Sequence, residues 1–209
     1  MKSTGRYIVI EGQDGTGKST QAKLLVEYLR KTGQTVLGIH EPGGGLASTT
    51  EIRRILKDKT YQLDPVSIVL LFAANRRELW VKTIEPALAR GETVVSDRNW
   101  LSTLAYEHYG FGVPAEVILQ IHRQSLPDRY LYPDTSLILA IDDDVRRRRL
   151  QQRDDSSQKD TFESQRDDFQ ARVIDGYQQI AKDYNAKIVD ASGTPEQIHS
   201  EMLSTLKLT

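Results

Sequence analysis

The sequence predicts an α/β fold in which a five-stranded parallel β-sheet is covered by helices on both faces. Short apolar runs rich in Val and Ile alternate along the chain with longer segments whose apolar residues recur at helical spacing. The first of these runs, 7–10, is apolar and β-branched, as a buried strand requires. The first run leads through a glycine-rich turn directly into the first helix, so strand and helix alternate from the start.

Composition sets the outer limits. The 209 residues, 38% hydrophobic and 27% charged, are enough for one α/β domain spanning residues 1–209. Lys and Arg total 28 against 29 Asp and Glu, so the basic excess typical of nucleic-acid binding is absent. The absence of cysteine excludes disulfides and thiolate metal sites. No apolar run approaches the ~20 residues of a membrane span, and we expect a cytoplasmic protein with neither membrane nor nucleic-acid partners.

The expected elements follow in order. The five strands are expected at 7–10, 34–39, 92–96, 137–141 and 187–190, each of which contains Val or Ile. The helices carry apolar residues at helical spacing and lie at 18–31, about 52–56, 65–90, 101–109, 114–126, 145–152, 162–184 and 195–206. Gly33 is a typical C-terminal stop for the first helix, and Pro195 suits the first turn of the last. Pro86 should kink or end the third helix, whose first part, 66–74, is apolar nearly all round and is expected to be buried.

Residues 12–19, Gly-Gln-Asp-Gly-Thr-Gly-Lys-Ser, fit the pattern G-x-x-x-x-G-K-[ST] of a phosphate-binding P-loop. The glycines permit backbone conformations in which successive N–H groups point at phosphate oxygens, and the helix dipole favours the same anion. The motif predicts a P-loop NTPase fold that binds a nucleoside triphosphate with Mg²⁺. The residues predicted to bind this nucleotide, which the resemblance given below implies is ATP, are Gly12, Gly15, Thr16, Gly17, Lys18, Ser19 and Thr20, with Lys18 on the β and γ phosphates and Ser19 on the metal.

Two loops follow strands at the sheet edge where open α/β sheets bind ligands. Glu41 and Pro42 follow the second strand and are predicted to bind substrate. Asp97 and Arg98 end the third strand, where a carboxylate can hold Mg²⁺ and an arginine can grip a phosphate, although a turn-capping Asp fits equally well. The acidic run 142–144 follows the fourth strand, and we favour helix capping over metal binding.

Four further side chains have both a structural and a functional interpretation. Phe72 and Arg76 are four residues apart and would suit an aromatic base by stacking and hydrogen bonding, or Phe72 is simply core. Arg149 and Arg153 share one helix face and would reach a phosphate chain, or are simply solvated. Arg153 leads into a polar stretch, and residues of about 146–162 are expected to form a mobile lid.

The sequence resembles the thymidylate kinase family along nearly its whole length. The matching motifs are Ile10-Glu11-Gly12, Glu41-Pro42-Gly43-Gly44, Leu71-Phe72-Ala73-Ala74 with Arg76, Asp97-Arg98, Leu101-Ser102-Thr103 with Ala105-Tyr106, and Pro133-Asp134. Further matches at the family's spacing are Asp160, Glu163, Phe169, Arg172 and Tyr177. The resemblance implies transfer of phosphate from MgATP to dTMP, giving dTDP and ADP, by a homodimer.

The resemblance also implies roles for single residues. Phe72 would stack on thymine, Arg76 would bond its carbonyl edge, and Asp14 would bind the sugar 3′-hydroxyl. Tyr106 would fill the space that a ribose 2′-hydroxyl needs. Two hydroxyl residues would lie beside the base, Ser102 and Thr103.

At the phosphates, the resemblance implies that Arg98, helped by Arg53, grips the acceptor. One branch of the family carries an Arg inside the P-loop, where this chain has Gly15. Arg149 and Arg153 match the lid arginines of the bacterial type, which would then supply the catalytic charge together with Lys18 and Arg98.

Five positions depart from the family pattern: His40 for Arg, Gly45 for Thr, Asn99 for an aromatic or His, Glu107 for Gln, and Thr161 for Arg. Because these positions belong to acceptor binding and the lid, they bear on turnover and on strictness for thymidine. Three other functions fit the same motifs. A deoxynucleoside kinase would use Glu41 or Asp97 as its base. A kinase of another deoxynucleotide would take a different acceptor. A non-enzymatic nucleotide switch fits less well, because it has no need of lid arginines.

Overall fold

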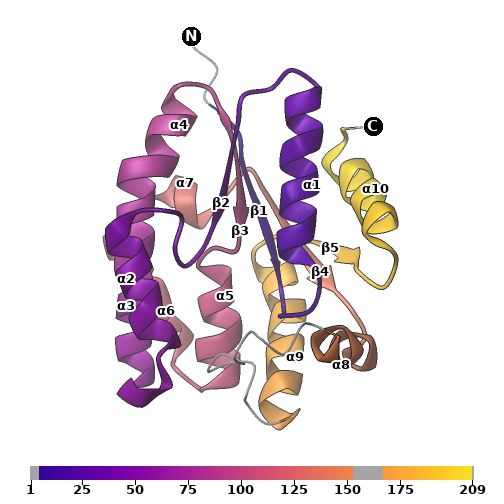
Figure 1. Cartoon of the computed structure of the whole chain (residues 1–209). Helices are drawn as coiled ribbons and strands as arrows, with labels where there is room; N and C mark the ends of the chain where they lie inside the picture. Colours follow the sequence, from indigo (N-terminus) through magenta and orange to yellow (C-terminus); the bar gives the residue numbers. More distant parts are fainter. Residues whose placement is uncertain (1–4, 153–166, 209) are drawn as a thin grey trace.

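The sheet has five parallel strands in the order β2-β3-β1-β4-β5, with β1 (Tyr7–Gly12) at its centre (Figure 1). The computed structural model describes residues 5–152 and 167–208. The other strands are β2 (Val36–His40), β3 (Thr93–Asp97), β4 (Thr135–Ala140) and β5 (Lys187–Asp190). All five predicted strands are confirmed, with ends shifted by no more than two residues.

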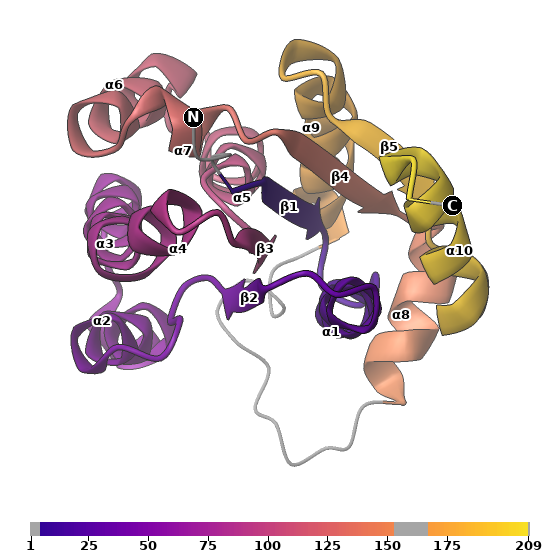
Figure 2. The same cartoon turned by 90° about the horizontal axis from the view of Figure 1, so that it is seen from above.

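Helices cover both faces of the sheet (Figure 2). Alternate side chains of β1 point to opposite faces, so Tyr7 and Val9 join one apolar core while Ile8 and Ile10 join the other. The core around Ile8 and Ile10 is closed by α1 (Lys18–Lys31) and α10 (Pro195–Leu206). The other helices are α2 (Ala47–Lys57), α3 (Pro65–Leu79), α4 (Glu85–Ala89), α5 (Leu101–Thr103), α6 (Ala115–Ser125), α7 (Asp128–Leu131), α8 (Asp143–Gln151) and α9 (Asp167–Asp183).

The predicted helix at 65–90 is α3 and α4 joined by a π-helical turn, η2 (Trp80–Ile84). In an α-helix Pro86 would lack one hydrogen bond and its ring would meet the carbonyl four residues earlier. In the wider π-helical turn each N–H bonds to the carbonyl five residues earlier, and not four. The N–H of Glu85 accordingly donates to the carbonyl of Trp80. The helix therefore passes through Pro86 and does not end there.

The expected helix at 101–109 is also mostly π-helical, with α5 followed by η3 (Leu104–Gly110). Two short elements escaped prediction, α7 and a 3₁₀ turn, η1 (Lys59–Tyr61). The part of the predicted helix 162–184 before residue 167 lies outside the described residues. So does the predicted lid from residue 153 onward.

The prediction that the apolar stretch 66–74 is buried was wrong for one side of α3. Val69 and Ala73 are buried, whereas Val66 is 37% exposed and Leu70 is 52% exposed. Only one side of α3 packs onto the apolar core. The residues on the opposite side stay exposed although they too are apolar.

The acidic run at 142–144 caps a helix, as predicted. The side chain of Asp142 accepts a hydrogen bond from the N–H of Asp144, and Asp143 pairs with Arg146 and Arg147. Within residues 5–152 and 167–208, no cluster of three acidic or His side chains could hold a metal. The helices of this part of the chain are too short or too polar to cross a membrane.

Candidate active site

A cavity of about 310 Å³ opens at the carboxyl ends of the central strands. Its size lies at the lower end of small-molecule sites. The cavity gathers most of the predicted residues: Asp14, Gly15, Gly17, Lys18, Ser19, Thr20, Glu41, Pro42, Arg53, Phe72, Arg76, Asp97, Arg98, Ser102, Thr103 and Tyr106. Three further residues line the cavity: Leu56 and Lys57, which were not predicted, and His40, which was noted only as a departure from the family pattern. Gly12, Thr16 and Arg149 are not among its lining residues, and Arg153 lies outside the described part of the chain.

The P-loop forms a tight cradle between β1 and α1. Gly12, Gly15 and Gly17 have φ angles of 136°, 91° and 93°, which residues with a Cβ rarely adopt. The Lys18 ammonium donates a hydrogen bond to the carbonyl of Gln13 at 2.6 Å. Burial, with the nearby Arg98 guanidinium, lowers the pKa of Lys18 to about 8, despite the opposing acidic groups around it. A bound phosphate would therefore stabilise the charged form of Lys18, which burial disfavours.

Helix α8 approaches the P-loop at Gly15. A Cβ on Gly15 would lie 3.0 Å from Cγ of Leu150 and 3.1 Å from Cγ of Arg146. A larger side chain here would therefore push α8 away, which gives a physical reason for the glycine at this position. The sequence did not identify Arg146 as the arginine that packs against the P-loop, because nothing in a run of four consecutive arginines shows which one is buried.

Ser19 and Asp97 fit a Mg²⁺ ion. The Ser19 hydroxyl donates to Oδ2 of Asp97 at 2.5 Å, and Oδ1 of Asp97 is buried with no hydrogen-bond partner among the described residues. Burial alone would raise the pKa of Asp97, but the hydrogen bond from His40 and the charges of Lys18 and Arg98 lower it to about 2. The carboxylate is therefore ionised at any physiological pH. Mg²⁺ commonly takes one or two protein oxygens, with waters and phosphates completing its octahedron.

His40 links the metal pair to the acceptor side of the cavity. Its Nδ1 lies 3.2 Å from Oδ2 of Asp97, and its Nε2 lies 2.7 Å from Nη1 of Arg53. Arg53 also donates to the carbonyl of Pro42. Because arginine only donates, Nε2 presents its lone pair and Nδ1 carries the hydrogen. Arg53 thus faces the cavity, while Arg54 pairs with Glu51 at the surface.

Arg98 follows β3 with a φ of 77°, a conformation that costs energy in a non-glycine residue. Its guanidinium donates to Asp14 at 2.6 Å, to the Ser102 hydroxyl at 2.9 Å and to the carbonyl of Gly12 at 3.0 Å. These bonds join the P-loop to the loop after β3. They hold a side chain that is only 12% exposed at the wall of the cavity.

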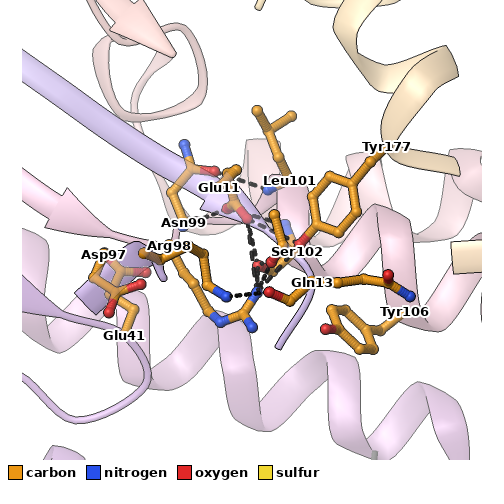
Figure 3. Close-up of polar contacts among 12 residues, drawn as sticks. Glu11, Gln13, Glu41, Asp97, Arg98, Asn99, Leu101, Ser102, Tyr106 and Tyr177 are labelled. Atoms are coloured by element: carbon orange, nitrogen blue, oxygen red, sulfur yellow. Dashed lines mark hydrogen bonds and ion pairs between the residues drawn. The ribbon is translucent and has the colours of Figure 1, made fainter. Parts of the chain in front are cut away.

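Glu11 holds the loop after β3 in place through hydrogen bonds, and it was not predicted as a site residue. Its fully buried carboxylate accepts hydrogen bonds from the N–H of Asn99 at 2.7 Å, the hydroxyl of Ser102 at 2.6 Å and the hydroxyl of Tyr177 at 3.0 Å. Figure 3 shows these groups gathered around Glu11 beside Arg98. The sequence could have indicated Glu11, because it directly follows an apolar strand. A carboxylate buried there requires hydrogen-bond partners.

The far end of the cavity offers an aromatic face and an arginine. The guanidinium carbon of Arg76 lies 5.0 Å from the ring centre of Phe72, and its Nη1 donates to the Thr103 hydroxyl at 2.7 Å. The Tyr106 hydroxyl lies 3.4 Å from the Asp14 carboxylate. Phe72 is half-buried and lines the cavity, so the alternative interpretation as core alone does not hold.

Arg149, on α8, contacts the turn between β5 and α10. Its Nη2 donates to the carbonyl of Gly193 at 3.0 Å, in the turn between β5 and α10. The reach of Arg149 and Arg153 to a phosphate chain stays a prediction.

The departures from the family pattern fall in different surroundings. Asn99 is buried and offers its carbonyl to Arg76. Glu107 is fully buried, and burial raises its pKa to about 8 despite the charge of Arg76. Gly45 is exposed, and Thr161 lies outside the described residues.

A P-loop after the central strand of this sheet, facing a cavity with arginines and an aromatic wall, defines the class of P-loop kinases that phosphorylate nucleotides. The model of the family described as thymidylate kinase matches residues 10–202. The thymidylate kinase of Gluconobacter oxydans is 38% identical over 208 residues, covering 99% of this chain and 96% of the relative. That of Chlorobaculum tepidum is 35% identical over 207 residues, covering 95% of each. The crystal structure of thymidylate kinase from Ehrlichia chaffeensis superposes with a TM-score of 0.77 at 31% identity, covering 97% of this chain and 98% of that one. The chain belongs to the thymidylate kinase family of nucleoside monophosphate kinases.

Proposed function

We propose that the protein transfers the γ-phosphoryl group of MgATP to the 5′-phosphate of dTMP, giving dTDP and ADP. The observation that carries this is one continuous cavity that runs from the P-loop to the Phe72 and Arg76 wall. The donor phosphates and the acceptor base therefore share one space, as direct transfer requires.

The acceptor needs no base from the protein. A phosphate monoester with a second pKa near ~6 is already a nucleophile at neutral pH. The two candidate bases of a deoxynucleoside kinase are both engaged elsewhere. Asp97 has a pKa of about 2 and is bonded to Ser19 and His40, while Glu41 is bonded to Arg76 and Tyr130. The geometry thus favours the nucleotide acceptor.

The proposed roles divide by the part of the substrate that each residue meets. Phe72 stacks on the base, Arg76 bonds its carbonyl edge, and two residues lie beside it, Ser102 and Thr103. Asp14 and Tyr106 lie beside the sugar. The residues that act on phosphate are Gly12, Gly15, Thr16, Gly17, Lys18, Ser19, Thr20, Arg53, Arg98, Arg149 and Arg153, and Glu41 and Pro42 complete the wall.

Catalysis then consists of alignment and charge neutralisation. Lys18 and the arginines stabilise the charge that spreads over the transferred group. Mg²⁺, held by Ser19 and Asp97, would neutralise charge on the ATP phosphates.

A single assay tests the assignment: ATP consumption with dTMP, with thymidine and with neither. Rapid consumption with dTMP alone is expected. Consumption with thymidine alone would identify a nucleoside kinase, and no acceptor-dependent consumption would favour a nucleotide switch.

Acceptor specificity gives a sharper test. Loss of the thymine methyl costs only ~1 to 3 kcal/mol in an apolar pocket, so dUMP should be a poor but measurable substrate. The ring of Tyr106 leaves a ribose 2′-hydroxyl clashing or unpaired, so UMP should react more slowly than dUMP. Steady-state kcat/KM for the three acceptors measures both effects, with Tyr106→Phe expected to keep most of the sugar discrimination. Equal values for dUMP and UMP, or a preference for dCMP or a purine nucleotide, would contradict the assignment.

We also propose a single domain that forms a homodimer in the cytoplasm. The exposed apolar side chains Val66 and Leu70 on α3 support the dimer, and Leu70 lines a groove together with Trp80, Ile121 and Leu126.

A further inference from the structure

Arg76 is held in place by hydrogen bonds to buried groups around its guanidinium. Its N–H groups donate four hydrogen bonds: Nε to Glu41 at 3.2 Å, Nη1 to Thr103 at 2.7 Å and to His122 at 2.9 Å, and Nη2 to the carbonyl of Asn99 at 2.8 Å. A guanidinium has five N–H donors. One N–H of Nη2 therefore has no partner among the described residues, and Arg76 lines the cavity.

His122 fixes one side of the guanidinium. Because Arg76 only donates, Nε2 of His122 must present a lone pair, and Nδ1 must carry the hydrogen that faces the carbonyl of Ile118 at 2.8 Å. Burial and the charge of Arg76 lower the pKa of His122 to about 3, so the ring stays neutral.

Tyr130 fixes the other side through Glu41. The Tyr130 hydroxyl, on α7, donates to Oε2 of Glu41 at 2.5 Å, the same oxygen that accepts from Nε of Arg76. Oε1 of Glu41 is buried and has no hydrogen-bond partner among the described residues. The position of this carboxylate therefore depends on Tyr130 and Arg76. Tyr130 is itself fully buried, with its ring packed on Tyr7 and Trp80 at centroid distances of 5.9 and 5.8 Å.

We propose that Tyr130 is a positioning residue for base selection: it holds Glu41, and Glu41 holds Arg76 so that a single N–H points at the base. A fixed donor suits the carbonyl oxygen of thymine or uracil. It opposes the exocyclic amino group of cytosine, because two N–H groups then face each other. The inference rests on the proposed function, and it places part of the specificity in a residue that never touches the substrate.

The test compares kcat/KM for dTMP and dCMP in Tyr130→Phe and in a matched control, Tyr7→Phe. The Tyr7 ring packs on Tyr130, and its buried hydroxyl has no hydrogen-bond partner in the described part of the chain. Tyr130→Phe should lower the dTMP to dCMP ratio about tenfold, mainly through a higher KM for dTMP, as fits loss of a bond to a charged group. Tyr7→Phe should stay within about twofold of wild type.

Glu41→Gln removes the charge at Nε of Arg76, so it should also lower the ratio. In that background Tyr130→Phe should have no further effect, since both act through one contact. The proposal is overturned if Tyr130→Phe behaves as Tyr7→Phe, if it lowers kcat and leaves the KM for dTMP unchanged, or if the effects of Tyr130→Phe and Glu41→Gln add. If Tyr130→Phe does not fold, Glu41→Gln alone decides, and an unchanged ratio overturns the proposal. Failure of the wild-type protein to phosphorylate dTMP would instead overturn the proposed function.

Discussion

At the scale of single residues, Lys18 combines a buried ammonium with a site built for anions. Burial lowers its pKa to about 8, so the free protein begins to lose this charge just above neutral pH. A bound phosphate favours the protonated form, so binding must take up a proton wherever Lys18 is neutral. ATP affinity should therefore fall above pH 8, approaching about tenfold per pH unit.

Calorimetry in buffers of different ionisation enthalpy measures both the affinity and the proton uptake. Lys18→Arg is the matched control, because arginine keeps its charge over this range and should show weaker binding without the pH slope. The same slope in both proteins would assign it to another group.

Arg149 makes a different kind of prediction, because its bonds in this structure go to backbone carbonyls beside the site. If it supplies charge to the transferred phosphoryl group, Arg149→Ala should lower kcat by about 10³-fold with little change in the KM for dTMP. Arg148→Ala, on the exposed face of the same helix, should leave kcat nearly unchanged. An unchanged kcat with a raised KM for ATP would show that Arg149 binds the donor only.

At the scale of elements, α9 fits against η3 through two glycines. A Cβ on Gly176 would lie 2.6 Å from Cγ of Tyr109, and one on Gly110 would lie 2.4 Å from Cε2 of Phe169. Arg172 adds bonds from α9 to the carbonyls of Tyr109 and Gly110. This close packing places the Tyr177 hydroxyl on Glu11, so a helix far along the chain completes the support of Arg98.

Gly176→Ala tests this packing. Replacing glycine by alanine inside a helix ordinarily stabilises it by up to about 1 kcal/mol. Here the clash with Tyr109 should outweigh that gain and destabilise the protein by about 1 to 3 kcal/mol. Thermal unfolding should show a lower Tm, while Gln178→Ala, on the exposed side of α9, should leave it nearly unchanged. A raised Tm for Gly176→Ala would mean that the helices part at little cost.

At the scale of the whole molecule, the proposed homodimer makes use of the exposed side of α3. Leu70 is 52% exposed, and a charge there opposes apolar contact between two copies without disturbing the core. Leu70→Glu should therefore shift the protein from dimer to monomer in size-exclusion chromatography with light scattering. Ile188→Glu is the matched control, because Ile188 is a similarly exposed residue, 45%, on the strand at one end of the sheet. If Leu70→Glu still runs as a dimer, the interface lies elsewhere on the protein.

The sequence by itself determined the sheet, the P-loop and most of the cavity wall. These features depend on local chemistry: apolar runs make buried strands, glycines make the phosphate cradle, and parallel strands bring their ends to one edge. Asp97 and Arg98 could be placed from the sequence because they end a strand next to that edge.

The tertiary structure alone decided which side chains support the site. Glu11, His122 and Tyr130 come from a strand and two separate helices, and only packing brings them to Arg98 and Arg76. The same holds for α3, where apolar residues on opposite sides look alike in sequence and differ only in what lies against them. Pro86 was expected to kink or end its helix, and the π-turn before it was not foreseen, because a widened turn depends on the packing on either side.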